Sequence, residues 1–379
     1  MTETAQTQPE SIDLQKAEDP RDVVHRTVAA LAQGMGVIFE VNGLRALAAG
    51  ALHARAFARL SGVSRNSRNK GSLTLLVKDA QELADWVPTL TPSTARFAAR
   101  VWPGPVTLVF PTPTPASTCL FHKLPQALRE GLTLDDSLAF HAPAAPFIRD
   151  VLRLFPGPLV CRTLPDGPSG INSPELSDPE NGFSLRVVSG ADSNEGEPTI
   201  VSIAECEWSI IHPGALSHAD LLKRAATTFL FICTGNTCRS PMAEAIFKVM
   251  LAERLGCGVD DLESRGYVVT SAGIAAMSGM PAAANAVDVL KARGGSLASH
   301  RSTRLTHDLL NDADHIIVMT GDHLDAILEH ASEAEPRIRL LHPHGLDVAD
   351  PVGADRETYK RTADAIESYL KPLLSLIPV

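Results

Sequence analysis

A nine-residue stretch, Cys233-Thr-Gly-Asn-Thr-Cys-Arg-Ser-Pro241, joins a short apolar run to an amphipathic segment. The apolar residues 229–232 predict a strand, and the pattern of residues 242–247 predicts a helix. A strand that enters a helix through so tight a loop aims backbone N–H groups and the positive end of the helix dipole at one point. We therefore expect an anion such as a phosphate group to bind there.

Two side chains make this loop a candidate for phosphoryl transfer. Cys233 is its first residue, and Arg239 follows six residues later. The N–H groups, the helix end and the guanidinium all favour thiolate over thiol, so Cys233 is the predicted nucleophile. Arg239 can hold two phosphoryl oxygens with its planar fork and stabilise the charge that they carry during transfer.

The other residues of the loop are predicted to bind the phosphate group. Gly235 and Asn236 suit the sparse φ values that such a tight loop requires. Ser240 is expected to cap the helix and to donate to the departing thiolate, while Pro241 fits the first helical turn. The predicted phosphate-binding residues are Thr234, Gly235, Asn236, Thr237, Cys238 and Ser240.

The nine-residue string resembles the loop of the low-molecular-weight protein tyrosine phosphatases, and the resemblance covers about residues 226–379. Ser271-Ala-Gly273 is similar to the next loop of that family, Ser299-His-Arg-Ser302 to its buried histidine segment and Asp350-Pro351 to its acid loop. The resemblance implies a three-layer α/β/α domain with a parallel sheet over residues 227–379. It also implies a phosphocysteine intermediate, a phosphorylated protein substrate and no cofactor.

Transfer through cysteine also needs an acid that protonates the leaving group and then a base that activates water. Asp350 is the predicted group, because Pro351 restricts it to extended backbone and stiffens the loop that presents it. Asp347 is the nearest rival and Asp355 a weaker one.

Further polar residues are predicted to support the loop. Ser271 is expected to hydrogen-bond the loop through Asn236, and His300 to brace it from behind, although both also fit a purely structural role. Cys238 lies close enough to Cys233 to form a protective disulfide, or it fills space in the loop. The histidines at 323, 330, 342 and 344 match no zinc spacing, so no metal is expected.

The choice of substrate depends on the residue four after the nucleophile. In phosphotyrosine-specific members this is typically a larger aliphatic residue, and aromatic residues follow the Asp-Pro pair. Here Thr237 and Val352-Gly353-Ala354 stand in these places, which resembles the bacterial members that act on protein phosphoarginine. Protein-arginine phosphatase is the predicted activity, with phosphotyrosine as the alternative. Arsenate reduction is disfavoured because no cysteine follows Cys257.

Residues 21–218 alternate predicted strands and helices, which indicates a separate α/β domain with a twisted sheet. Trp102-Pro-Gly-Pro-Val-Thr-Leu and Ile210-Ile-His-Pro-Gly-Ala215 resemble segments of the YrdC-like threonylcarbamoyl-AMP synthases. The ligand-binding residues of that family are replaced, so we expect a non-catalytic domain. The replacements lie in Glu40-Val-Asn-Gly-Leu-Arg-Ala46, Ser64-Arg65-Asn66 and Thr163-Leu164-Pro165, and at His141 and His212.

A basic stretch lies within this domain, since residues 41–78 contain five arginines, two lysines and no acidic residue. RNA or a nucleotide is therefore a candidate partner, and a solvated helix face is the other interpretation. A different class of function makes the chain a synthase-like nucleotide- or RNA-binding protein with an accessory phosphatase domain.

Composition limits the remaining possibilities. Residues 1–20 are polar and acidic, which predicts a disordered tail without a signal peptide. No apolar run reaches membrane length, and six cysteines in 379 residues do not suggest a disulfide framework. A reactive cysteine requires a reducing compartment, so the cytoplasm is predicted. Short helices are expected over 80–90 and 281–293, and a helical linker over 219–226.

Overall fold

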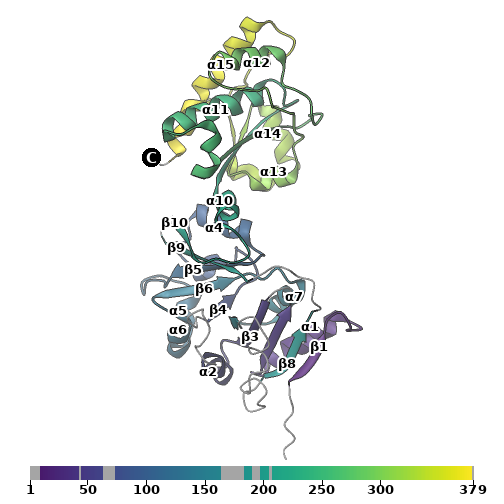
Figure 1. Cartoon of the computed structure of the whole chain (residues 1–379), viewed down its shortest axis with the longest axis vertical. Coiled ribbons are helices and arrows are strands. Elements are labelled where there is room, and N and C mark those ends of the chain that lie inside the picture. Colours follow the sequence, from purple (N-terminus) through teal and green to yellow (C-terminus); the bar gives the residue numbers. More distant parts are fainter. Residues whose placement is uncertain are drawn as a thin grey trace, which may run out of the picture. The chain divides into compact units, whose positions relative to one another are not determined.

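The computed structural model describes residues 9–41, 44–62, 73–163, 183–189, 197–204 and 207–377. The chain divides into two compact units, Met1–Ala225 and Ala226–Val379 (Figure 1). The first unit runs from purple to teal in the figure, and the second from green to yellow.

The second unit is built on a sheet of parallel strands in the order β12-β11-β13-β14. Its first strand along the chain, β11, lies inside the sheet between β12 and β13. The chain therefore leaves β11 where the strand order reverses, the place at which open parallel sheets bind ligands. The strands are β11 (Thr227–Cys233), β12 (Tyr267–Gly273), β13 (His315–Val318) and β14 (Ile338–Leu340).

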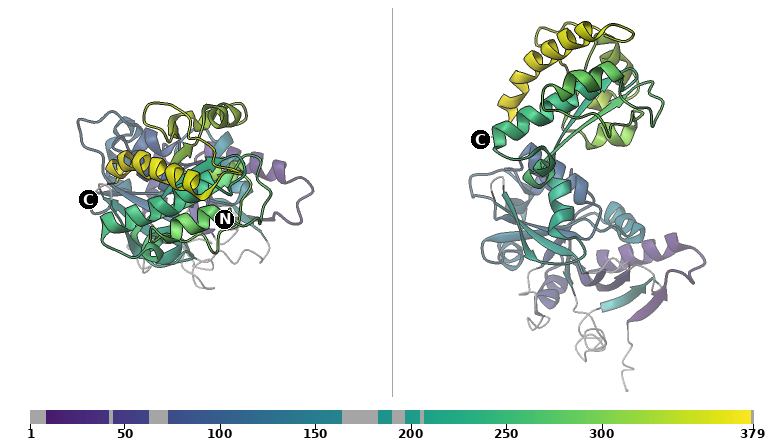
Figure 2. Two further views of the ribbon diagram at one scale, coloured as in Figure 1. Left: turned by 90° about the horizontal axis from the view of Figure 1, so that it is seen from above. Right: turned by 45° about the horizontal axis from the view of Figure 1, so that its top comes forward.

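Helices cover both faces of this sheet, which confirms the predicted three-layer α/β/α architecture. Three of them, α11 (Arg239–Leu255), α12 (Ala284–Lys291) and α15 (Arg356–Leu370), pack on one face. The other face carries α13 (His307–Asp312) and α14 (Gly321–Leu328). Figure 2 shows α15 in yellow running beside α11 in green. Short 3-10 helices complete the unit at Val259–Asp261, Glu263–Arg265, Ser332–Arg337 and Lys371–Leu376.

The apolar run that precedes the phosphate loop is buried on both of its faces. Phe229 and Phe231 pack under α11, while Leu230 and Ile232 pack toward α13 and α14. A parallel strand covered on both sides needs apolar residues at every position, which explains the continuous run. This packing fixes the end of β11, and hence the start of the loop.

One helix of this unit begins later than its sequence predicts. Pro281 indicates a helix start, but α12 begins only at Ala284. The N–H of Ala283 instead donates to the carbonyl oxygen of Thr237 (2.9 Å), so this part of the chain is bound to the phosphate loop. Gly294 ends the helical segment with a φ of 76°, as glycine at that place predicts.

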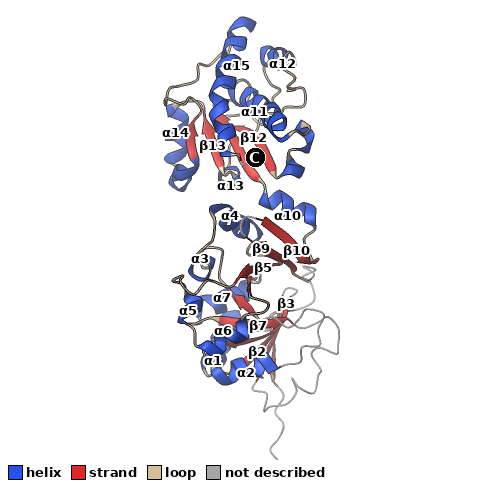
Figure 3. Cartoon of the chain, turned by 90° about the vertical axis from the view of Figure 1, so that its left-hand side faces the viewer, coloured by secondary structure: helices blue, strands red, loops and turns tan. Residues whose placement is uncertain are grey.

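The first unit is an α/β domain with a mixed sheet, whose strands are red in Figure 3. The order of the described strands is β1-β8-β2-β3-β7-β4-β6-β5-β9-β10. Apolar clusters lie on both faces of this sheet. Its strands are β1 (Glu10–Asp13), β2 (Gly36–Val41), β3 (Leu44–Gly50), β4 (Thr74–Leu76), β5 (Val106–Pro111), β6 (Ser137–His141), β7 (Leu159–Thr163), β8 (Phe183–Val188), β9 (Thr199–Ala204) and β10 (Glu207–His212). Its helices are α1 (Pro20–Ala32), α2 (Ala54–Gly62), α3 (Leu83–Trp86), α4 (Pro92–Val101), α5 (Leu120–Lys123), α6 (Gln126–Leu132), α7 (Pro146–Leu154) and α10 (His218–Ala225).

Of three predictions for this unit, two are wrong and one is confirmed. The tail is not disordered through residue 20, because β1 pairs with β8 and satisfies its backbone groups there, and Asp19 caps α1. The segment expected to be a helical linker is helical, as α10, and it packs on α4 and buries Leu221 completely. The helix predicted over 80–90 is reduced to α3. Among the described residues, no helix has the length and hydropathy needed to span a bilayer.

Candidate active site

The predicted phosphate loop connects the end of β11 to the start of α11. Cys238 is the N-cap residue of α11, and its side chain makes no capping hydrogen bond. Of the two residues predicted to suit sparse φ values, Asn236 adopts a φ of 55°, in the left-handed region. This conformation turns the chain sharply just before the helix.

The thiol of Cys233 is buried at the base of this loop, with 3% of the residue exposed. Its Sγ lies 2.9 Å from Oγ of Ser240 and accepts a hydrogen bond from the N–H of Asn236 (3.3 Å). The predicted capping role of Ser240 is wrong, because its Oγ points at Cys233 and at the carbonyl oxygen of Ala272 (3.3 Å). The N–H of Asn236 therefore points at the sulfur, and the hydroxyl of Ser240 lies beside it.

Asn236 is the centre of a buried hydrogen-bond network behind the loop. Its Nδ2 donates to Oγ of Ser240 and to Oγ of Ser271, both at 2.9 Å. Its Oδ1 accepts from the N–H of Thr303 (2.8 Å), and its carbonyl oxygen accepts from Nε2 of His300 (2.9 Å). The contacts predicted for Ser271 and His300 are therefore present, and they hold Asn236 in its unusual conformation.

Glu244 extends this network and was not predicted from the sequence. Its Oε2 accepts a hydrogen bond from Oγ of Ser271 (2.6 Å), and its Oε1 pairs with Nζ of Lys248 (2.6 Å). Glu244 lies four residues after Ser240 on α11, so both side chains share one helix face. The four-residue spacing between Ser240 and Glu244 is the sequence feature from which the place of Glu244 could have been predicted.

The predicted arginine and acid meet at the mouth of the loop. Nη2 of Arg239 lies 2.5 Å from Oδ2 of Asp350, and Nη1 donates to the carbonyl oxygen of Val348 (3.2 Å). The two rival acids are engaged elsewhere. Asp347 accepts from the N–H of Gly321 (2.8 Å), and Asp355 caps α15.

Cys238 and Cys233 are both free thiols. Sγ of Cys238 lies 3.1 Å from the hydroxyl of Tyr359 on α15 and 3.7 Å from Oγ1 of Thr237. Burial raises the pKa of Tyr359, and the hydrogen bond with Cys238 raises it further. The hydroxyl therefore stays protonated and connects the loop to the last helix.

His323 also contacts the loop. From the sequence, this histidine was considered only as a zinc ligand, and its spacing argued against that role. Its Nε2 lies 2.9 Å from Oγ1 of Thr234, and its Nδ1 lies 2.8 Å from Oγ1 of Thr320. Within the described ranges, no group of three or more His, Cys, Asp or Glu side chains could hold a metal ion.

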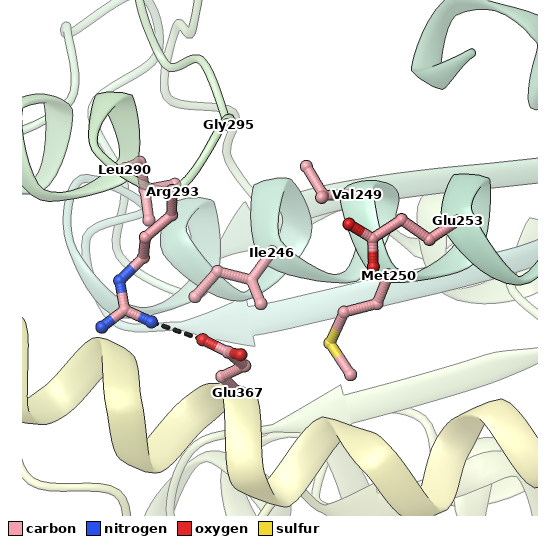
Figure 4. Close-up of a pocket in the computed structure, with 8 residues that line it drawn as sticks. All are labelled: Ile246, Val249, Met250, Glu253, Leu290, Arg293, Gly295 and Glu367. Atoms are coloured by element: carbon pink, nitrogen blue, oxygen red, sulfur yellow. Dashed lines mark hydrogen bonds and ion pairs between the residues drawn. The ribbon is translucent and has the colours of Figure 1, made fainter.

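A pocket of about 270 Å³ in the second unit lies away from these residues (Figure 4). It lies between α11 and α15, and Arg293 crosses it to pair with Glu367. None of its lining residues is a predicted site residue. They are Ile246, Val249, Met250, Glu253, Leu290, Arg293, Gly295 and Glu367.

The histidines that replace family arginines in the first unit lie apart from each other. His141 ends β6 and His212 ends β10, with β5 and β9 between these strands. His141 is buried, and its Nδ1 donates to the carbonyl oxygen of Val106 (2.9 Å). The other replaced stretches include residues 42–43, 64–66 and 164–165, which lie outside the described residues.

Comparison with known protein families finds a matching model for each unit. A family model for low molecular weight phosphotyrosine protein phosphatase matches residues 228–378. A model for the Sua5/YciO/YrdC family, described as telomere recombination, matches residues 29–214. The sequence resemblances noted for the two units are thereby confirmed.

Individual relatives match the second unit. A protein-arginine-phosphatase of Bacillus subtilis is 38% identical over 149 residues, which cover 38% of this chain and 92% of the relative. A probable low molecular weight protein-tyrosine-phosphatase, EpsP, of Ralstonia nicotianae is 34% identical over 37% of this chain and 88% of the relative. The structure of the YwlE arginine phosphatase from Geobacillus stearothermophilus is 35% identical, with a TM-score of 0.34, over 40% of this chain and 92% of that one.

These relatives define the class of the protein as a phosphatase, an enzyme that hydrolyses phosphorylated substrates. The chain belongs to the low molecular weight phosphotyrosine protein phosphatase family, and it carries a YrdC-like unit before the phosphatase unit.

Proposed function

We propose that the chain is a protein-arginine phosphatase that works through a phosphocysteine intermediate. The observation that carries this proposal is the convergence of three side chains on one loop. The buried Cys233 thiol ends β11, Arg239 begins α11, and Asp350 lies 2.5 Å from Arg239. A nucleophile, an anion clamp and a proton donor thus share one site.

The proposed reaction has two steps. The thiolate of Cys233 attacks phosphorus, so that the P–S bond forms as the bond to the leaving group breaks, and Asp350 gives its proton to the departing nitrogen or oxygen. Water then attacks phosphorus and gives a proton to Asp350, and the P–S bond breaks to release phosphate. Arg239 and the loop N–H groups hold the phosphoryl oxygens in both steps. Ser240 lies 2.9 Å from the sulfur, where its hydroxyl stabilises the departing thiolate.

Thr237 supports phosphoarginine as the substrate. It is half-buried in the loop, where its hydroxyl offers a polar contact to a guanidinium. Val352, the second residue after Asp350, is 68% exposed and gives no aromatic wall for a phenyl ring. Two relatives that bear the name protein-arginine-phosphatase are 38% and 36% identical to this chain. Phosphotyrosine is the alternative, supported by relatives named as tyrosine phosphatases.

The test measures phosphate release from phosphoarginine-bearing and phosphotyrosine-bearing protein side by side. We expect activity on phosphoarginine that C233S abolishes, and a phosphoryl group on the Cys233 peptide after rapid acid quenching. Thr237→Val keeps the shape of the side chain and removes its hydroxyl, so it should reduce the preference for phosphoarginine. A strong preference of the wild type for phosphotyrosine would overturn the assignment of the substrate and leave the assignment of Cys233 intact.

For the YrdC-like unit we propose a non-catalytic binding role toward RNA or a nucleotide. His141 is buried and its Nδ1 is bound to the carbonyl oxygen of Val106, which supports the loss of a ligand contact at this position. Arg55 and Arg59 lie exposed on α2 and belong to the basic stretch, whereas Arg65, Arg68 and Lys70 lie outside the described residues. Threonine-dependent ATP turnover by the intact chain would contradict this proposal.

The same chemistry bears on location. A nucleophilic thiolate is oxidised outside reducing compartments, and we therefore place the protein in the cytoplasm. Fractionation of cells that produce the chain would test this assignment.

A further inference from the structure

The first turn of α14 contacts both loops of the candidate site. His323 binds Thr234 of the phosphate loop through Nε2 (2.9 Å). The N–H of Gly321 donates to Oδ1 of Asp347, three residues before Asp350 (2.8 Å). One helical turn therefore holds a residue from the loop of the nucleophile and a residue from the loop of the acid.

His323 is fixed on both sides of its ring. It is 3% exposed, and its Nδ1 lies 2.8 Å from Oγ1 of Thr320. Thr320 is the N-cap residue of α14, because its Oγ1 also accepts from the N–H of His323 (3.3 Å). Because both ring nitrogens have hydrogen-bond partners, the ring cannot rotate. The N-terminal cap of α14 therefore fixes the position of Thr234, the residue next to Cys233.

We propose that His323 is a positioning residue for Cys233, and that the first turn of α14 fixes the separation between the nucleophile and the proton donor. This inference rests on the proposed phosphatase function. Its physical basis is that the reacting groups must lie within a fraction of an ångström of their productive places, since a displacement of about 1 Å costs about a hundredfold in rate.

The charges around His323 show which form of the ring does this work. Burial lowers the pKa of His323, and the positive charge of Arg239 lowers it further. The acidic groups that oppose this shift are Asp322, Asp350 and Asp347. The neutral imidazole is therefore the working form at neutral pH, and protonation would put a second cation beside Arg239.

The experiment compares the purified full-length wild type with H323A, H323Q, T234V and the double variant H323A/T234V. H323A and T234V should each lower kcat about tenfold, with little change in KM. The double variant should also lose about tenfold, because both changes break one interaction. H323Q places an amide near the Nε2 position, so it should recover part of kcat and move the acid limb of the kcat profile to lower pH. His330→Ala, an exposed histidine just after α14, is the matched control and should keep kcat.

The contact between α14 and the acid loop is tested separately with Asp347→Ala. Its rates are measured on two aryl phosphates, phenyl phosphate and p-nitrophenyl phosphate. Phenolate is a much poorer leaving group than p-nitrophenolate, so a displaced proton donor lowers the rate on phenyl phosphate more than the rate on p-nitrophenyl phosphate. We expect this selective loss in D347A, and a loss on both substrates in H323A and T234V.

Three outcomes would overturn the inference. The first is a kcat for T234V and H323Q equal to that of His330→Ala. The second is a loss of kcat in the double variant equal to the product of the losses in the single variants. The third is an equal loss of rate on both aryl phosphates in D347A. T234V changes an exposed side chain, so it tests the inference even where H323A fails to fold. Failure of the proposed function is seen separately, as activity that survives C233S.

Discussion

Arg239 and Asp350 form an ion pair in which the cation is buried and the carboxylate is not. Nη2 of Arg239 lies 2.5 Å from Oδ2 of Asp350, and their side chains are 7% and 39% exposed. A phosphoryl group that binds the guanidinium competes with Asp350 for the same N–H groups. In the proposed mechanism, substrate binding therefore frees Asp350, the proposed proton donor, through this single arginine side chain.

Replacement of the acid gives the most direct prediction from this pair. Asp350→Asn keeps an oxygen for Arg239 but cannot give up a proton, so kcat should fall by about 10²–10⁴-fold. The loss should be larger on phenyl phosphate than on p-nitrophenyl phosphate, because the better leaving group needs less protonation. Steady-state rates on both substrates measure this.

Asp355→Asn is the matched control for that variant. Asp355 accepts a hydrogen bond from the N–H of Thr358 (2.9 Å) at the start of α15, and asparagine caps helices equally well. Its rate should stay near that of the wild type. Equal losses in the two variants would mean that neither carboxylate acts as the acid in the way proposed.

The backbone of the phosphate loop leaves no room for a side chain at Gly273. A Cβ at this position would lie 2.6 Å from the carbonyl oxygen of Thr234 and 2.9 Å from the backbone N of Asn236. Backbone atoms cannot move aside cheaply, so Gly273→Ala should displace the phosphate loop, destabilise the second unit by about 2 kcal/mol and lower kcat.

The control for this change is Gly295→Ala. A Cβ there would meet nothing nearer than 3.6 Å, which is ordinary contact, so activity and stability should hardly change. Urea titration of phosphatase activity follows the second unit in both variants. A Gly273→Ala protein with wild-type kcat would contradict the packing argument.

The strand, loop and helix around Cys233 were predicted well because the structure of each depends mainly on neighbouring residues in the chain. The strand, the loop and the helix that carry Cys233 and Arg239 are consecutive, and each has its own pattern of apolar or loop-forming residues. Asp350 lies 111 residues after Arg239, and the resemblance to a family, rather than spacing, pointed to it.

The contacts that were missed join segments far apart in the chain. His323 reaches Thr234 across 89 residues, and Tyr359 reaches Cys238 across 121. Nothing in the sequence around Tyr359 predicts a partner for its hydroxyl. Its hydroxyl has a partner only because α15 packs against α11, and no periodic pattern reports that. For the same reason β1 could not be predicted, since its partner β8 lies 175 residues away in the register Glu10 to Leu185 (185 − 10).

The contact between Tyr359 and Cys238 should contribute to stability rather than to chemistry. Tyr359→Phe removes the hydroxyl that lies 3.1 Å from Sγ of Cys238 and leaves the ring in place, so the second unit should lose about 1 kcal/mol. Tyr369→Phe is the control. The ring of Tyr369 lies against the imidazole of His342, with centroids 4.4 Å apart. Urea midpoints of activity would decide, and equal midpoints for the two variants would argue against the contact.

The first unit has its own titratable group in the core. Burial lowers the pKa of His141 from 6.5 to about 4, although its hydrogen bond to the carbonyl oxygen of Val106 acts in the opposite direction. The protein has three tryptophans, and Trp86, Trp102 and Trp208 all lie in the first unit. Tryptophan fluorescence therefore follows the unfolding of this unit in the intact chain.

The lowered pKa of His141 predicts that the first unit loses stability in acid. The unfolded chain binds a proton near pH 6.5 and the folded unit only near pH 4, so stability is full above pH 6.5 and falls as the pH drops toward 4. The loss through this histidine should reach about 3 kcal/mol. His141→Asn keeps a donor near the Nδ1 position without a titratable ring, so its urea midpoint should depend less on pH. Parallel midpoints for the two proteins between pH 7 and pH 4.5 would show that His141 is not the cause.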